Sequence, residues 1–157
     1  MISGPRRRGR ECALQLLYQM EGASPRPQGH ADPAALDVDE RLRSYWAHFG
    51  EPDAPAAESE QWRAFAETLV RGVCADLTAI DALLGQASQH WRLERMSRVD
   101  RSILRIAVYE LRHEPEVPTS VVLDEAIEIA KRFGTEESPA FVNGVLDRVA
   151  RDVRGPQ

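Results

Sequence analysis

The sequence has little of what most metal, redox, nucleotide-binding and membrane proteins need. It contains only two cysteines, Cys12 and Cys74, and four scattered histidines, with no CxxC or HxxxH spacing that would indicate a zinc site or a disulfide framework. No stretch approaches the roughly 18 apolar residues of a membrane helix, and the GxxxxGK, GxGxxG, HExxH and GxSxG motifs are missing. We therefore expect a cytoplasmic protein with reduced thiols, no metal, no cofactor, no membrane contact and no enzymatic activity.

Lysine is also nearly missing, because Lys131 is the single lysine among 20 basic residues. The net charge is -5, but residues 31–60 hold eight acidic side chains against Arg41 and Arg43, which gives that segment a charge of -6 and the rest of the chain +1. The first ten residues, by contrast, carry four arginines and no acid: Arg6, Arg7, Arg8 and Arg10. Positive charge gathered where a helix begins predicts a small surface that attracts the phosphates of a nucleic acid.

The hydrophobic pattern predicts an all-α protein, since apolar residues recur at spacings of three and four and no window alternates with a period of two. We expect one domain over residues 1–157, with a mobile, acidic, Pro/Ala-rich loop at 50–60. The first predicted helix covers 5–21, and Asp32 and Pro33 open a second one. A long helical stretch follows from Trp62 toward Trp91, with bends at Gly72 or Gly85. The last three predicted helices run from near Asp100 to Pro115, from Thr119 or Ser120 to Gly134, and from Ser138 and Pro139 to Gly155.

Two glycines in these predicted helices need an explanation. Gly134 is expected to end its helix in the left-handed conformation. Gly144 follows Asn143 inside the last helix, where glycine costs about 1 kcal/mol relative to alanine. We therefore expect Asn143 and Gly144 to permit a close approach between helices.

Tyr18 has two interpretations. Arg7 and Tyr18 fall within about 20° of each other on a helical wheel, so that an arginine and an aromatic ring can share a face and offer phosphate contacts and base stacking to single-stranded RNA. The alternative is a solvated N-terminus followed by an ordinary half-buried tyrosine. Phe141 is equally open, because it can stack a base near a helix N-terminus or simply begin the apolar stripe that continues with Val145.

Four segments resemble the bacterial NusB family of transcription antitermination factors. They are RRRGRECALQLLYQMEG (6–22), VDRSILRIAVYEL (99–111), VPTSVVLDEAIEIAKRFG (117–134) and FVNGVLDRVA (141–150). The resemblance implies a NusB-type helical bundle of about six to seven helices. It further implies a protein that binds boxA-type single-stranded RNA together with the small-subunit ribosomal protein NusE, and that joins other Nus factors on RNA polymerase during ribosomal RNA transcription.

The resemblance also assigns roles to residues at the matching positions of this sequence. The implied RNA-binding residues are Arg6, Arg7, Arg8, Arg10, Lys131, Phe133, Glu137 and Phe141. The implied contacts to the ribosomal protein are Tyr18, Glu94 and Asp100, and for Tyr18 this role is preferred over base stacking. By spacing alone Phe133 is a core residue, and Glu137 is ordinary charge near a helix N-terminus.

Some features depart from the family pattern and leave alternatives open. Residues 23–61 have no recognisable family pattern, and Pro139 and Ala140 stand where a basic contact would be expected. One alternative is the NusB-like domain of ribosomal RNA cytosine methyltransferases, although 157 residues leave no room for a cofactor domain. Another is a helical protein–protein scaffold or homodimer that masks the arginine face. The sequence does not determine the oligomeric state, the RNA sequence preference or the affinity for RNA without the partner.

Overall fold

The computed structural model describes residues 4–22, 37–49, 56–88 and 92–156, and in these ranges the chain is helical with no β-strand. The all-α prediction is confirmed. The chain divides into two compact units, an N-terminal unit (Met1–Ala75) and a C-terminal unit (Asp76–Gln157). None of the helices in the described ranges is long and apolar enough to cross a membrane.

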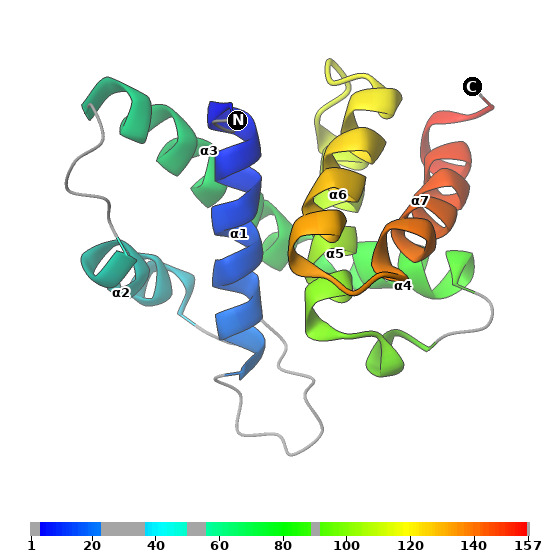
Figure 1. The fold of residues 1–157 in the computed structure, drawn as a ribbon, viewed down its shortest axis with the longest axis horizontal. Helices are drawn as coiled ribbons and strands as arrows, with labels where there is room; N and C mark the ends of the chain where they lie inside the picture. The colour runs from blue at the N-terminus through cyan, green and yellow to red at the C-terminus, as the bar shows by residue number, and fades with distance from the viewer. Residues whose placement is uncertain (1–3, 23–36, 50–55, 89–91, 157) are drawn as a thin grey trace. The chain divides into compact units, whose positions relative to one another are not determined.

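The N-terminal unit contains α1 (Pro5–Gly22), α2 (Val38–Phe49) and α3 (Ala56–Ala75) (Figure 1). The main packing joins α1 to α3, and its core consists of Ala13, Leu14, Leu16, Leu17, Met20, Trp62, Ala66, Leu69, Val70 and Val73. Hydrogen bonds fix α2 to both neighbours: the Tyr45 hydroxyl donates to Gln15 Oε1 of α1 at 2.7 Å, and Trp46 Nε1 donates to Glu67 Oε1 of α3 at 2.9 Å.

The starts of α2 and α3 differ from the prediction. The expected cap at Asp32 lies outside the described residues, whereas α2 begins at Val38 and Asp37 accepts a hydrogen bond from the Glu40 N–H at 3.1 Å. Residues 50–55 of the expected loop are also outside the described ranges, but α3 already begins at Ala56, so the loop prediction for 56–60 is wrong. The N-cap signal of Asp37 was overlooked because Asp32 and Pro33 offered a stronger pattern.

The long predicted stretch from Trp62 breaks at Asp76, rather than at Gly72 or Gly85, and α4 (Leu77–Ala87) follows. Asp76 accepts hydrogen bonds at 2.7 Å from Arg112 Nε and from His113 Nε2, both on α5. Burial alone would raise the pKa of the Asp76 carboxyl, but these two bonds and the nearby positive charge outweigh it and leave the pKa lowered. The break therefore coincides with a contact distant in sequence.

The C-terminal unit is built around α5 (Arg98–His113), which packs against α4, α6 (Thr119–Phe133) and α7 (Ser138–Arg154) (Figure 1). A short 3-10 helix, η2 (Leu93–Arg95), precedes α5. Every residue of α5 from Arg101 to Val108 is buried, including two arginines. Arg105 forms a two-pronged ion pair with Asp81 of α4, with both N–O distances 2.9 Å. Arg101 Nη1 donates to the carbonyls of Leu93 and Met96, which fixes η2 to α5.

Arg154, the last residue of α7, caps the C-terminal end of α5. Its guanidinium donates to the carbonyls of Glu110, Leu111, Glu114 and Val117 and to the Thr119 hydroxyl, at 2.6–3.2 Å. The final carbonyls of a helix have no partner within the helix, so a single arginine here satisfies the end of α5 and the loop that leads to α6.

The helix ends of the C-terminal unit correct several local predictions. Ser97 caps α5 by accepting from the Asp100 N–H at 3.0 Å, and Asp100 is an acid in the first turn of this helix. The cap of α6 is Pro118, and Ser138 is already inside α7, where its hydroxyl accepts from the Thr135 N–H. Gly155 ends α7 with φ +83°, in agreement with the prediction.

The left-handed conformation predicted for Gly134 and the close approach predicted at Gly144 are both wrong, although α6 does end at Gly134 as expected. Gly134 has φ -93°, which any residue adopts, but a Cβ there would lie 2.5 Å from the Cβ and Oγ of Ser138 and 2.8 Å from the Ala130 carbonyl oxygen. Gly144 is exposed, as is Asn143, and a Cβ on Gly144 would meet nothing within 4 Å. The close approach expected at Gly144 occurs instead at Gly134.

Replacing Arg154 by alanine is expected to lower the free energy of unfolding by about 2 kcal/mol or more, because buried carbonyls lose a charged donor. Arg151→Ala is the matched control, since Arg151 is on the same helix and its exposed side chain pairs with Asp147 at 2.9 Å. It should change stability by about 0.5 kcal/mol or less. Urea unfolding measures both values, and equal losses for the two variants would contradict the capping role.

Alanine is expected to have opposite effects at the two glycines. Gly144→Ala should stabilise the protein by up to about 1 kcal/mol, because it improves helix propensity without any steric contact. Gly134→Ala should destabilise it, because backbone and side-chain atoms already occupy the space. Thermal unfolding of the two variants tests this, and a rise in melting temperature for Gly134→Ala would disprove the steric argument.

Candidate RNA- and partner-binding surfaces

The arginine run forms the first turns of α1, where three of its guanidinium groups lie over aromatic rings of α3. The Cζ atoms of Arg6 and Arg10 are 5.1 and 5.3 Å from the centroid of the Phe65 ring, and Arg8 Cζ is 5.1 Å from that of Trp62. These distances are within the range of cation–π attraction. The arginines are therefore held on rings of the same unit rather than extended freely into solvent.

The four arginines of the run are not equivalent. Arg6 is exposed, and Arg7 and Arg8 are partly exposed, but Arg10 has only 4% of its surface exposed. An open patch of four arginines was expected, whereas the structure leaves three of them accessible. Arg10 is a packing residue beside Phe65.

Gly9 explains how the arginines come so close to α3. It is buried, and a Cβ at this position would lie 2.8 Å from Phe65 Cδ1 and 3.0 Å from the Trp62 carbonyl oxygen. Contacts this short exclude any larger side chain without a shift of the helices. The glycine therefore allows the backbones of α1 and α3 to approach and places the rings beneath the guanidinium groups.

Further along α1, Tyr18 is 39% exposed, which makes it one of the most exposed large apolar side chains in the described ranges. It lies in the N-terminal unit together with the arginine run. The rest of the side chain is covered by the protein, so Tyr18 is partly buried, as in the simpler interpretation, and partly open. An exposed ring on an ordered helix is suited to contact with another molecule.

Cys12 lies on the same helix but is a poor nucleophile. Burial raises the pKa of its thiol, and this effect exceeds the opposing influence of the Tyr45 hydroxyl and of nearby arginines. Burial likewise raises the pKa of Tyr45. Both groups stay protonated at neutral pH, so neither provides an activated nucleophile.

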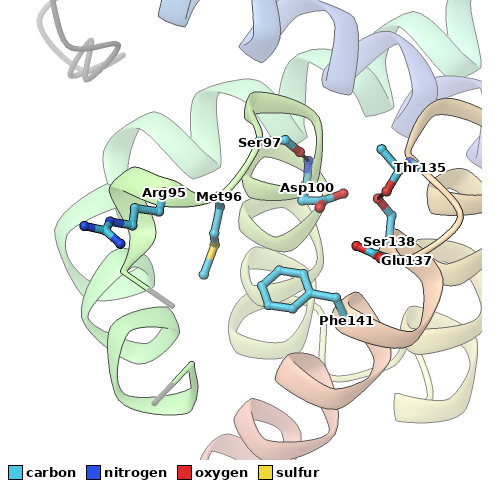
Figure 2. Close-up of a pocket in the computed structure, with 8 residues that line it drawn as sticks. All are labelled: Arg95, Met96, Ser97, Asp100, Thr135, Glu137, Ser138 and Phe141. Atoms are coloured by element: carbon cyan, nitrogen blue, oxygen red, sulfur yellow. Dashed lines mark hydrogen bonds between the residues drawn. The ribbon is translucent and has the colours of Figure 1, made fainter. Parts of the chain in front are cut away.

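In the C-terminal unit, one pocket of about 240 Å³ brings together three of the predicted functional residues: Asp100, Glu137 and Phe141. Figure 2 shows the Phe141 ring extending from α7 toward Met96, with the Asp100 carboxylate nearby on α5. The remaining lining residues are Arg95, Met96, Ser97, Thr135 and Ser138. The volume is below the about 300–1,000 Å³ of typical sites for drug-sized ligands, so it suits a single flat ring or one side chain.

The polar groups of this pocket are fixed by local hydrogen bonds. The Ser97 hydroxyl accepts from the Asp100 N–H, and the Ser138 hydroxyl accepts from the Thr135 N–H (Figure 2). The Oδ1 atom of Asp100 is buried and has no hydrogen-bond partner in the described ranges. Buried oxygens of this kind are uncommon and are often found where a ligand or partner supplies the missing donor.

The other predicted residues of the C-terminal unit lie outside the pocket lining. Glu94 is exposed on η2, and Lys131 is exposed near the end of α6, where it pairs with Glu128 at 3.0 Å. Phe133 is partly exposed and has Arg132 Cζ 5.2 Å from its ring centroid, so it is neither fully in the core nor fully open. The structure thus groups Asp100 with Glu137 and Phe141 but leaves Glu94, Lys131 and Phe133 separate from them.

Sequence reasoning missed several residues of both surfaces. Met96, Ser97 and Thr135 line the pocket, and Trp62 and Phe65 carry the arginines of α1. The rings of α3 were recognised only as an apolar stripe. A pattern within one helix does not reveal which residues of another helix it will meet, so no local signal could have identified these contacts.

Solved structures with the same architecture include known NusB proteins. NusB of T. maritima superposes with a TM-score of 0.72 at 36% sequence identity, over 96% of this chain and 94% of that one. A crystal structure of the antitermination factors NusB and NusE in complex with double-stranded RNA matches with a TM-score of 0.74 at 19% identity, over 94% of this chain and 97% of that one. The second likeness, at so low an identity, concerns the fold alone.

Sequence comparison extends the likeness over almost the whole chain. The transcription antitermination protein NusB of Syntrophotalea carbinolica is 45% identical over 163 residues, which cover 98% of this chain and 97% of the relative. The sequence profile of the NusB family matches residues 7–151. Because that match includes the arginine-bearing start of α1 as well as α5, α6 and α7, the chain belongs to the NusB family.

Proposed function

We propose that this protein is a transcription antitermination factor that binds boxA-type single-stranded RNA together with the ribosomal protein NusE. In this role it joins other Nus factors on RNA polymerase while ribosomal RNA is transcribed. The observation that carries the proposal is the ordered row of guanidinium groups on α1, in a chain whose relatives are named as antitermination proteins. A solved NusB–NusE complex with RNA supports the choice of partners by analogy.

On the RNA side, the arginines of α1 supply contacts to phosphates. Arg6, Arg7 and Arg8 are accessible, and arginine's planar group can donate two hydrogen bonds to one phosphate. Arg10 supports them from below by packing against Phe65. Contacts of this type fix the position of the RNA but do not read its sequence.

In the C-terminal unit, Phe141 and Glu137 supply contacts to bases. A partly exposed phenylalanine ring in a pocket of this size can stack on one unpaired base, and a carboxylate at the rim can accept from a base amino group. Lys131 and Phe133 on α6 are the remaining RNA contacts of the proposal. The sequence preference for boxA arises from these residues, because only groups that touch base edges discriminate between sequences.

On the partner side, Tyr18, Glu94 and Asp100 contact the ribosomal protein. Tyr18 offers an exposed ring, and Glu94 an exposed carboxylate. The Asp100 Oδ1 atom, which has no partner in the described ranges, accepts a donor from NusE. Asp100 also lines the pocket of Phe141, so the RNA and the ribosomal protein meet at this place.

The proposed role is that of a non-catalytic adaptor in the cytoplasm, where transcription takes place. It needs no cofactor, since binding energy alone performs the function. A homodimer that masks the arginine face is the competing arrangement, and light scattering with and without RNA separates the two.

The direct test of the proposed function is a titration of labelled boxA RNA with this protein, alone and with NusE. The pair should bind boxA more tightly than either protein alone and more tightly than a scrambled RNA or a double-stranded competitor. Equal affinity for boxA and scrambled RNA would contradict the proposal.

Salt dependence tests the role of the arginine run. If Arg6, Arg7 and Arg8 each contact one phosphate, a triple alanine variant should make the slope of log K against log salt less negative by about 2, at about 0.7 per single-strand phosphate. Arg10→Ala should instead act mainly on stability, because that side chain is buried. An unchanged slope in the triple variant would rule out this contact mode.

Phe141→Leu is expected to weaken boxA binding by about 1–3 kcal/mol, because leucine keeps the apolar contact but loses the ring that stacks on a base. The control is Val121→Ala, since Val121 is a 40% exposed apolar residue on α6 that does not line the pocket. Fluorescence anisotropy with boxA RNA measures both variants. If the Phe141→Leu variant binds boxA RNA like the wild type, the ring does not stack on a base and its role is only structural.

A further inference from the structure

Arg63, on α3, is a fourth arginine of the described part of the N-terminal unit that lies against aromatic rings. Its Cζ atom is 5.1 Å from the Trp46 ring centroid and 5.6 Å from that of Trp62. The two indoles contact each other edge to face, with centroids 5.6 Å apart. Arg63, Trp46 and Trp62 therefore all contact one another. Trp62 is buried, and Arg63 is partly exposed.

Two described carboxylates of α2 and α3 are engaged with groups other than Arg63. Glu67, one helical turn further along α3, accepts a hydrogen bond from Trp46 Nε1 at 2.9 Å. Asp39 of α2 pairs with Arg71 at 2.6 Å. Within the described ranges no ion pair or hydrogen bond joins Arg63 to an acid, and its Nε is buried without a partner. Within the described ranges, its positive charge is thus held in place without an acidic partner.

Arg63 is also close to the arginine run of α1. Arg8 Cζ is 5.1 Å from the centroid of the Trp62 ring, the same ring that Arg63 contacts. Both arginines act electrostatically on the Cys12 thiol, where each favours a lower pKa against the dominant effect of burial. Two guanidinium groups from different helices therefore share one indole, which extends the positive surface of α1 onto α3.

We propose that Arg63 binds a phosphate of the RNA and that Trp46 and Trp62 hold its guanidinium group in position for this contact. The inference rests on the proposed function and adds a residue of α3 to the RNA surface of α1. Packing against rings uses the faces of the guanidinium plane, while the N–H donors lie at its edge. A guanidinium ordered in this way binds phosphate with a smaller loss of side-chain freedom than an extended arginine.

The experiment compares Arg63→Gln with Arg71→Gln in the complex with NusE and labelled boxA RNA, over a series of salt concentrations. Both variants remove one positive charge from α3, but Arg71 is paired with Asp39, whereas Arg63 has no acidic partner in the described ranges. Arg63→Gln should make the slope of log K against log salt less negative by about 0.7, and Arg71→Gln should leave it unchanged. The loss of RNA affinity in Arg63→Gln, relative to the wild type, should therefore shrink about 2.6-fold between about 50 and 200 mM salt. Arg63→Lys, which keeps the charge, should retain the slope.

The possible outcomes separate this inference from the proposed function. A wild-type slope in Arg63→Gln, together with a reduced slope in the triple variant of Arg6, Arg7 and Arg8, overturns the role of Arg63 and leaves the proposed function intact. Equal changes of the salt slope in Arg63→Gln and Arg71→Gln also overturn it, because the loss of one positive charge anywhere on α3 would then explain the effect. A wild-type complex that binds no RNA overturns both. Thermal unfolding of each variant confirms that the comparison is made between folded proteins.

Discussion

The structure depends on how it accommodates the guanidinium group, which carries nearly all of its positive charge. In the N-terminal unit, Arg6, Arg8 and Arg10 lie over the rings of α3. In the C-terminal unit, Arg105 pairs with a carboxylate, while Arg101 and Arg154 donate to backbone carbonyls. A planar, weakly hydrated group with donors along its edge can stack on a ring and still donate several hydrogen bonds, which suits it to both kinds of contact better than a compact ammonium. The same chemistry that packs these helices also suits them to bind phosphate.

The two units use this chemistry for different purposes. Arg101 and Arg105 of the C-terminal unit are buried and bonded within the protein itself, so they contribute to the order of α5 and its neighbours. Near the start of α1, Arg6 and Arg8 lie over rings, and these two residues and Arg7 remain accessible. Rigid placement before binding reduces the entropy lost when a flexible RNA strand is captured. The helix pairing made possible by Gly9 is thus part of the binding surface as well as of the fold.

Much of the fold could be predicted from the sequence, because periodic apolar residues decide which segments become helices. The bounds of α1, α5 and α6 were found to within a few residues, and Gly155 ends α7 as expected. Predictions failed where the outcome depends on contacts between side chains rather than on the apolar pattern. The break at Asp76 coincides with bonds from Arg112 and His113, which are distant in sequence, whereas Gly134 is required by a local contact with Ser138, not by its own backbone angles. Exposed Gly144 has no steric explanation in the structure.

The sequence by itself determined the all-α class, the family and the concentration of arginine at the start of α1, since composition and helical periodicity are properties of the chain read in order. Only the tertiary structure decided that Arg10 is buried while its neighbours stay accessible, that Asp100 shares a pocket with Phe141, and that Arg63 lies against two indoles. The physical reason is that burial and stacking arise between helices, and the spacing of residues within one helix does not specify which side chains of another helix it will meet.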